Sequence, residues 1–133
     1  MITHAPRRGE RGFSLVELVI VVVIIGILAA IAVPVFLRQR ENGWRAQVES
    51  DLKNASLAIE NGAIGLDGLY GFADAQDETS AVLATNGFNA SPDVEFTVSA
   101  TDSEFRITGG HTRLVNAPTT AVYDSASGTI VWP

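Results

Sequence analysis

The chain has 133 residues, with 9 basic, 15 acidic and two histidine side chains, a net charge of −6 and no cysteine. The absence of cysteine excludes disulfide staples, and with only two histidines it argues against a zinc site. No phosphate-binding loop, nucleophile elbow or paired metal motif occurs in the chain. We therefore expect no enzyme activity, no cofactor and no metal.

The first predicted segment, residues 1–12, is a short basic leader. It contains three arginines and one glutamate, a net charge of +2, whereas the rest of the chain has six basic and 14 acidic residues, a net charge of −8. Arginines ahead of an apolar segment favour a cytoplasmic N-terminus, although three more arginines flank the other end of that segment. The charge of −8 makes binding of bulk DNA through its phosphates unlikely.

Residues 13–37 form the second segment, an almost purely apolar run. Leu18 to Leu37 is a stretch of 20 residues without a charge, long enough to cross a hydrocarbon core of about 30 Å as a helix. An ordinary secretory signal has a shorter apolar core and is cut after it. Here the candidate cleavage site lies before the core, so the mature protein would keep its anchor.

Glu17 is the one charged side chain of this segment. A carboxylate is strongly disfavoured in hydrocarbon unless it is paired, so an isolated one indicates a functional site. A cut between Gly12 and Phe13 would place a cationic α-amine four residues before Glu17, within the same helix or facing a Glu17 of a parallel, staggered copy. The second arrangement would set the register of an assembly. The alternative is an uncleaved signal anchor whose Glu17 reaches the membrane interface.

Gly26 and Pro34 interrupt the apolar segment. Glycine weakens a helix through backbone entropy, and proline deletes a backbone hydrogen bond. The favoured interpretation is a helix hinge that depends on packing. A simple kink is the alternative, because both residues are tolerated in membrane helices.

Residues 38–62 are predicted to continue the same helix as an amphipathic half. Apolar side chains recur at intervals of three or four, at Trp44, Val48, Leu52, Ala55 and Ile59. This is the spacing of one helix face. Charged residues, Asp51 among them, are expected on the remaining surface, and Gly62 is expected to be the C-cap. A helix from Ser14 to Asn61 would be about 70 Å long.

Residues 63–133 are too few for a generous core of their own and should pack on the amphipathic helix face. Residues 63–92 are predicted to be a long loop with a short helix at 77–84. Alternating apolar residues predict hairpins at 94–107 and 120–132, with an extra short strand at Leu114 and Val115. The predicted fold class is α+β: a long N-terminal helix, half membrane-spanning and half amphipathic, packed against a small antiparallel β-sheet of three or four strands.

Two groups of residues have the chemistry of metal ligands without a matching pattern. Asp74, Asp77 and Glu78 form the densest carboxylate cluster and could ligate calcium, but their spacing fits no EF-hand loop. We interpret them as a solvated acidic loop. His4 lies in the leader, and His111 stands alone beside two glycines.

The start of the chain resembles the leader, cleavage site and mature N-terminus of type IV pilins. The motif has Gly12 before the cut, Phe13 after it, Glu17 at the fifth mature position, and a long apolar helix behind the leader sequence Arg7-Arg8-Gly9-Glu10-Arg11. The close resemblance covers the first third of the chain. Because it has no cysteine, the chain is most similar to the pilins that lack a C-terminal disulfide.

The resemblance implies that a prepilin peptidase removes residues 1–12 and that Phe13 becomes N-methylated. The subunit would wait in the cytoplasmic membrane, among lipids, as a single-pass precursor. An assembly ATPase and a platform membrane protein would then add it to an extracellular filament of many copies. In that filament Glu17 would meet the Phe13 amine of a neighbouring copy, and the stretch between Gly26 and Pro34 would lose helicity.

The expected function is therefore that of a structural subunit of a type IV pilus, serving adhesion, motility or DNA uptake. The alternative is a pseudopilin of a type II secretion-like system or a minor pilin. Major pseudopilins often carry an Asn-Pro-Trp-Gly segment, which is absent here. A different class is a surface binding module on a permanent single-helix anchor, for which the junction at Gly12 and Phe13 would be a coincidence.

Overall fold

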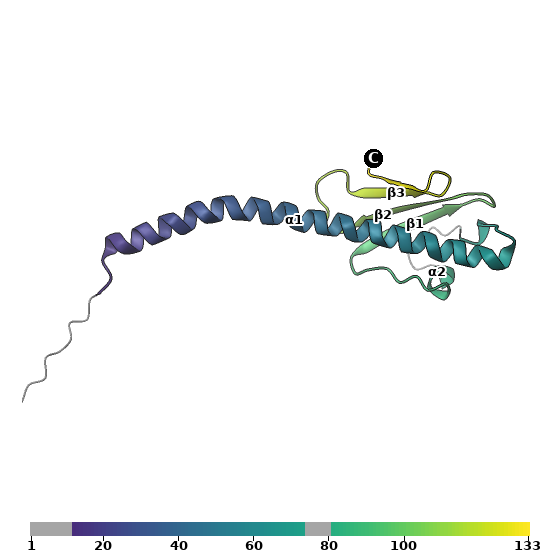
Figure 1. The fold of residues 1–133 in the computed structure, drawn as a ribbon, viewed down its shortest axis with the longest axis horizontal. Helices are drawn as coiled ribbons and strands as arrows, with labels where there is room; N and C mark the ends of the chain where they lie inside the picture. Colours follow the sequence, from purple (N-terminus) through teal and green to yellow (C-terminus); the bar gives the residue numbers. More distant parts are fainter. Residues whose placement is uncertain (1–11, 74–80) are drawn as a thin grey trace, which may run out of the picture. The chain divides into compact units, whose positions relative to one another are not determined.

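The computed structural model describes residues 12–73 and 81–133. Its largest element is helix α1, Leu15–Ala63, with 49 residues (Figure 1). The expected single helix is confirmed; it begins one residue later and ends two residues later than predicted. Contacts divide the chain into two units, one ending at Arg38 and the other running from Gln39 to Pro133. Each unit is described by itself, and the second is called the head.

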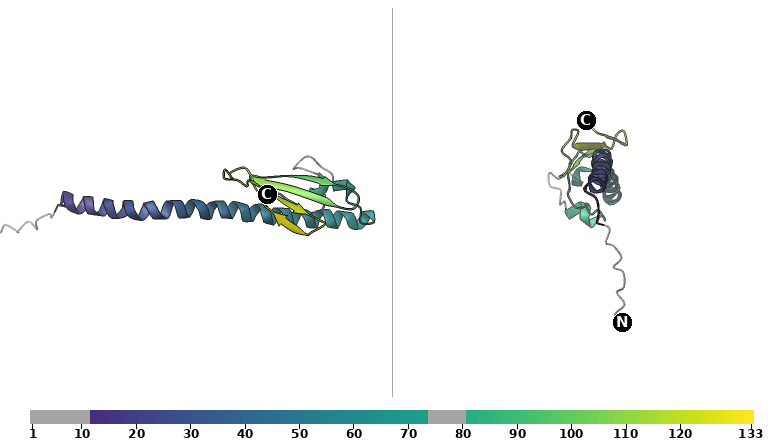
Figure 2. Two further views of the ribbon diagram at one scale, coloured as in Figure 1. Left: turned by 90° about the horizontal axis from the view of Figure 1, so that it is seen from above. Right: turned by 90° about the vertical axis from the view of Figure 1, so that its left-hand side faces the viewer.

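The head contains a four-stranded sheet. Its strands are β1 (Val94–Ala100), β2 (Phe105–His111), β3 (Thr120–Asp124) and β4 (Thr129–Val131). They lie in the order β1-β2-β3-β4, and each neighbouring pair is antiparallel, so the sheet is a simple meander (Figure 2). Both predicted hairpins and the α+β fold class are thereby confirmed.

The extra strand predicted at Leu114 and Val115 is wrong. The backbone N–H of Leu114 donates to the carbonyl oxygen of His111 at 2.9 Å, so the chain turns directly after β2. Leu114 is nevertheless buried, whereas Val115 is fully on the surface. Two apolar residues in a row can therefore fit the pattern of a short strand although they lie after a turn.

The core of the head lies between α1 and one face of the sheet. The helix contributes side chains that are at most 2% exposed, namely Val48, Leu52, Ala55 and Ile59. In β1, buried and exposed residues alternate, with Val94, Phe96 and Val98 facing inward. The helical period of 3.6 and the strand period of two thus bring two apolar faces together. Trp44, the fifth member of the predicted stripe, is only half-buried and stacks on the His111 ring, with 5.3 Å between centroids.

Gly109 allows α1 and β2 to come close together. A Cβ at this position would lie 3.0 Å from Cδ2 of Leu52 and 3.5 Å from Cβ of Phe96. Real Cβ atoms rarely make a contact as short as the first, so a side chain at Gly109 would require the packed Leu52 side chain to move by a few tenths of an ångström.

The end of α1 differs from the prediction that Gly62 is its C-cap. The helix continues to Ala63 and is followed by a short 3-10 turn, η1, Ile64–Leu66. The left-handed conformations come later, at Asp67 (φ 55°) and Gly68 (φ 81°). The Gly68 N–H donates to the Ala63 carbonyl oxygen at 2.9 Å, which satisfies a carbonyl group at the helix end.

The segment between α1 and β1 contains two further short elements, η2 (Gly71–Ala73) and α2 (Ala81–Thr85). In the described part of the range predicted for a short helix, 77–84, the chain is helical, and residues 77–80 lie outside the described residues. The candidate calcium ligands Asp74, Asp77 and Glu78 lie outside them as well.

Asp51 was expected on the polar surface of α1, and that expectation is wrong. Its side chain is only 5% exposed. Its Oδ2 accepts a hydrogen bond from the Ser91 N–H at 2.8 Å, and its Oδ1 accepts one from the Ser91 hydroxyl at 3.0 Å. The carboxylate is tolerated because a loop 40 residues away brings two donors to it.

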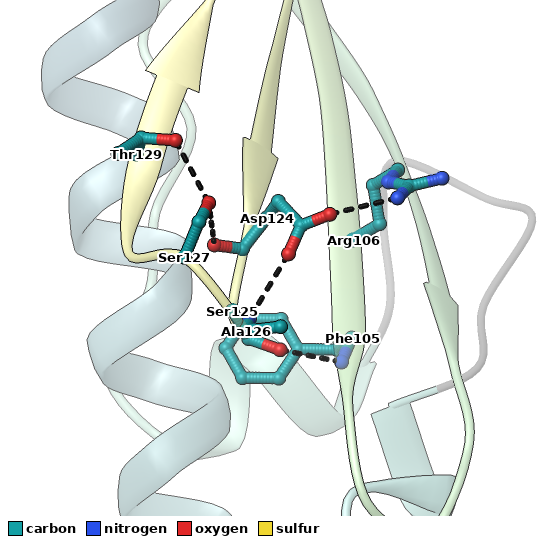
Figure 3. A network of polar contacts seen from close by, with 7 residues as sticks. All are labelled: Phe105, Arg106, Asp124, Ser125, Ala126, Ser127 and Thr129. Atoms are coloured by element: carbon teal, nitrogen blue, oxygen red, sulfur yellow. Dashed lines mark hydrogen bonds and ion pairs between the residues drawn. The ribbon is translucent and has the colours of Figure 1, made fainter.

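The turn between β3 and β4 is tied to β2 by a network of polar contacts (Figure 3). Asp124 accepts from the Arg106 guanidinium at 2.7 Å and from the Ala126 N–H at 3.0 Å. Ser125 exchanges two bonds with Phe105: its hydroxyl accepts at 2.8 Å and its N–H donates at 3.0 Å. The Arg106 hydrogen bond is the largest cause that lowers the pKa of Asp124.

Candidate assembly segment

The N-terminal unit is an apolar helix that no other part of its unit covers. All of its described residues are exposed, from Gly12 to Arg38. One stretch, Leu15–Leu66, includes an 18-residue window with a mean hydropathy of 3.3, and none of that window is buried. By length and composition this helix can cross a membrane. The same exposed surface can also pack against copies of itself.

Glu17 begins this surface, and its carboxylate is held by the backbone. Its Oε2 accepts a hydrogen bond from the Ser14 N–H at 2.9 Å. The Leu18 N–H donates to the Ser14 carbonyl oxygen at 3.2 Å, which makes Ser14 the residue where the helix starts. In a capping box, a glutamate three residues after the N-cap accepts a hydrogen bond from the N-cap N–H, and Glu17 makes this contact with Ser14.

This capping contact was missed in the sequence analysis, although the Ser-x-x-Glu spacing is its usual signal. The contact has two consequences. It orients the carboxylate at the first helical turn, where the helix dipole favours negative charge. It also leaves the other oxygen, Oε1, without a partner among the described residues. A cationic amine could therefore bind Glu17 without breaking the cap.

Gly12 and Phe13 precede α1 in non-helical backbone, and both are exposed. A Cβ on Gly12 would meet no atom within 4 Å, and its φ is not positive. Nothing within the described chain therefore requires glycine here. The arginines and Glu10 of the predicted leader lie outside the described residues.

Gly26 and Pro34 do not break α1, which is helical through both. A Cβ on Gly26 would also meet no atom within 4 Å. Pro34 has no N–H, so the carbonyl group of Ala30 has no helical donor and one hydrogen bond of the helix is missing at this turn. The hinge stays a prediction.

The other charged or titratable residues considered as functional candidates lie in the head, where they contact neighbouring side chains. His111 is buried, stacks on Trp44, and accepts a hydrogen bond at Nδ1 from the Arg113 N–H at 3.1 Å. Arg113 pairs with Asp93 at 2.8 Å. Among the residues that the structure describes, no three His, Asp or Glu side chains are placed to hold a metal ion.

The segment thus has the features of a polymerising anchor: a bare apolar helix, a capped glutamate in its first turn, and an exposed Gly-Phe junction directly before it. Comparison with known families agrees with this class. Residues 7–33 match the prokaryotic N-terminal methylation motif. The predicted resemblance to type IV pilins is confirmed.

Three relatives show the range of the match. The chain is 51% identical over 44 residues to the type IV major pilin protein PilA of Myxococcus xanthus. These 44 residues are 33% of this chain and 20% of that protein. It is 39% identical over 82 residues to the type IV major fimbrial protein FimA of Dichelobacter nodosus, 59% of this chain and 49% of that protein. With the type II secretion system core protein G of Klebsiella pneumoniae it shares 44% over 51 residues, 38% of this chain and 36% of that protein.

The chain thus spans half or less of the length of these relatives. The similarity therefore bears on the N-terminal segment more than on the head. No solved structure matches the chain significantly.

Proposed function

We propose that this protein is the structural subunit of a type IV pilus. The observation that carries the proposal is the N-terminal methylation motif placed on a fully exposed apolar helix with one capped glutamate. The similarity to PilA and FimA, both major pilus proteins by name, supports the same assignment. The subunit is structural, and no enzyme activity is assigned to it.

Maturation would occur at the Gly12–Phe13 junction. A prepilin peptidase removes residues 1–12, and the new amine of Phe13 is methylated. The exposed state of both residues leaves the junction open to such an enzyme. Since no neighbouring atom in the described chain restricts Gly12, the need for glycine would come from the peptidase.

Assembly would then exchange one apolar environment for another. The helix holds the subunit in the cytoplasmic membrane, because exposing apolar surface to water costs about 25 cal/mol per Å². An assembly ATPase and a platform membrane protein would drive the transfer into a filament, where helices of other copies replace lipid. The free Oε1 of Glu17 would accept a hydrogen bond from the Phe13 amine of a neighbouring copy. This contact would fix the register between neighbouring helices in the filament. The segment between Gly26 and Pro34 would lose its helical hydrogen bonds where the packing in the filament requires it.

The first experiment is to measure the intact mass and N-terminal sequence of the protein from its native host. We expect a chain that begins with methylated Phe13. A chain that still carries Arg11-Gly12 at steady state would overturn the proposal and favour a permanently anchored surface module.

Two substitutions at Glu17 remove its charge, one with and one without its capping oxygen. Glu17→Gln keeps an acceptor for the Ser14 N–H but has no charge, whereas Glu17→Ala has neither. Both variants should be processed, and both should accumulate in the membrane without forming fibres. Normal fibres from Glu17→Gln expressed as the sole copy would refute the proposed ion pair with the neighbouring Phe13.

A pseudopilin of a type II secretion system is the second candidate, because the core protein G of such systems matches the same N-terminal segment. The two candidates differ in where the fibre grows. Fibres sheared from the surface of the native host that contain this chain as their main component favour the pilin. A chain found only in the cell envelope, needed for protein export, favours the pseudopilin.

A further inference from the structure

The head begins almost directly after the uncharged part of the apolar segment. Leu37 ends the stretch of 20 residues without a charge, and Arg40 follows it by three residues, about 4.5 Å along a helix. Twenty helical residues span a hydrocarbon core of about 30 Å, and a headgroup layer of about 5–7 Å lies on each side of that core. In a membrane-anchored chain, the first turn of the head therefore lies at the level of the lipid headgroups.

Arg40 and Trp44 are a pair of side chains suited to that level. The Arg40 guanidinium carbon lies 4.9 Å from the Trp44 ring centroid, and Arg40 forms no ion pair among the described residues. The ring also stacks on His111 at the end of β2, which fixes it to the head. Tryptophan is enriched at membrane interfaces because its ring is amphipathic, and arginine can keep its charge in the headgroup layer while its stem contacts apolar groups.

The loop between β2 and β3 brings an apolar side chain to the same end of the head (Figure 1). Asn116 ties this loop to α1, because its amide donates to Oε2 of Glu41 at 2.9 Å and its carbonyl oxygen accepts from the Arg45 guanidinium at 3.1 Å. The preceding residue, Val115, is 83% exposed, the largest value for a large apolar side chain in the described part of the head. An apolar cover for Val115 must come from outside the head.

The charges at this end nearly balance, so attraction to an anionic surface does not explain a contact there. Three of its carboxylates have donors: Glu41 binds Asn116 and Arg45, Glu49 binds Trp132, and Asp93 binds Arg113. The fourth, Glu95, lies on the exposed face of β1 and forms no ion pair with a described residue. The features that remain are one unpaired guanidinium, a ring at the interface level and a bare aliphatic side chain. Together they fit a phospholipid, whatever the net charge of its headgroup.

We propose that this end of the head, named the docking end and formed by Arg40, Trp44 and Val115, binds the outer surface of the membrane that holds the precursor. The Arg40 guanidinium would donate two parallel hydrogen bonds to a lipid phosphate. Trp44 would lie among the headgroups, and Val115 would insert beside it. The inference rests on the membrane step of the proposed function. It adds that the head itself binds lipid, so extraction of a subunit must break this contact as well as withdraw the helix.

Two nitroxide labels test whether the head docks or stands clear of the membrane. The chain has no cysteine, so Val115→Cys and Ile64→Cys each give one labelling site in the full chain. The two side chains are matched in exposure, at 83% and 80%, but Ile64 follows Arg40 by 24 residues, about 36 Å along α1. In phosphatidylcholine vesicles, the label at 115 should collide with a water-soluble nickel chelate at most about half as often as the label at 64, because only the first lies in the headgroup layer.

Charge variants of the Val115→Cys chain test the phosphate contact. Arg40→Glu should raise the collision rate of the label with the nickel chelate about twofold, as expected for the loss of one exposed ionic contact. Arg40→Lys keeps a cation and should change the rate less. Lys53→Glu is the matched control, because Lys53 is an exposed cation farther along α1 and the substitution changes the charge equally. It should leave the rate unchanged.

Flotation with the vesicles, measured for each variant, confirms that its apolar helix is inserted. Equal collision rates for the labels at 115 and 64, or equal rates in Arg40→Glu and Lys53→Glu, would overturn the proposed docking. A chain that does not float would overturn the docking together with the membrane step of the proposed function. A chain whose label at 115 is protected as expected, but which forms no fibres in its native host, would support the docking and overturn the pilus assignment.

Discussion

Trp132 anchors the C-terminal end of the head to α1. Its indole N–H donates to Oε1 of Glu49 at 2.9 Å, and the Arg45 guanidinium lies 4.7 Å from its ring centroid. The chain has no cysteine to make this connection covalently. Trp132→Phe removes the donor and keeps a ring, so it isolates the hydrogen bond.

The cost of Trp132→Phe follows from the surroundings of the bond. A hydrogen bond to a charged group contributes about 1.5–3 kcal/mol when buried. Both side chains are half-buried here, so we expect a loss of about 1 kcal/mol after solvent screening. For a domain of the size of residues 39–133, this lowers the melting temperature by about 4–8 °C. Trp132→Ala also removes the cation–π contact and the ring, for a total of about 2–3 kcal/mol.

Thermal unfolding of the full chain in detergent, followed by far-UV circular dichroism, measures these losses. Glu49→Gln is the matched control, since it keeps an acceptor oxygen and should cost less than Trp132→Phe. Once Trp132→Phe is present, Glu49→Gln should cost nothing further, because the shared bond is already lost. A Trp132→Phe variant that melts with the parent chain would refute the role given to this bond.

Three further predictions concern the head, each measured by the same unfolding assay. Asp51→Ala should destabilise by about 1–3 kcal/mol, because the half-buried Ser91 N–H and hydroxyl lose their acceptor, and Asp51→Asn should cost less. Gly109→Val should cost about 1–3 kcal/mol through overpacking against α1. Because the folded pKa of Asp124 is lowered by Arg106, its contribution is present above the unfolded pKa and is lost as pH falls through the folded one. Arg106→Gln should therefore flatten the acid side of the stability profile, and an unchanged profile would contradict this.

The elements of the fold could be predicted where the sequence pattern is long and regular. The stripe from Val48 to Ile59 and the alternation in β1 each encode one buried face, and both faces were found in the core. The prediction failed where two patterns look alike over a short stretch. Leu114 and Val115 fit a strand, yet the hydrogen bond that ends β2 turns the chain before them.

The burial of Asp51 could not be predicted from its own neighbourhood. Helical periodicity assigns each residue to a face, but whether a carboxylate is tolerated on a covered face depends on donors from elsewhere. Those donors come from Ser91, far along the chain. The hydrogen bond from Trp132 to Glu49 joins residues 83 positions apart and was not predicted for the same reason. Contacts over such distances become visible only when the fold is known.

A comparison of carboxylates strengthens the case that Glu17 needs an external partner. In the head, Asp51, Glu41 and Asp124 each have both oxygens engaged by donors from the chain. Glu49 has one engaged oxygen, but it lies at a half-exposed position where water can serve the other. Glu17 also has one engaged oxygen, on a helix whose apolar surface implies lipid or packed helices around it. Neither environment supplies the missing donor, and this supports the proposal that a cation from another subunit is the partner of Glu17.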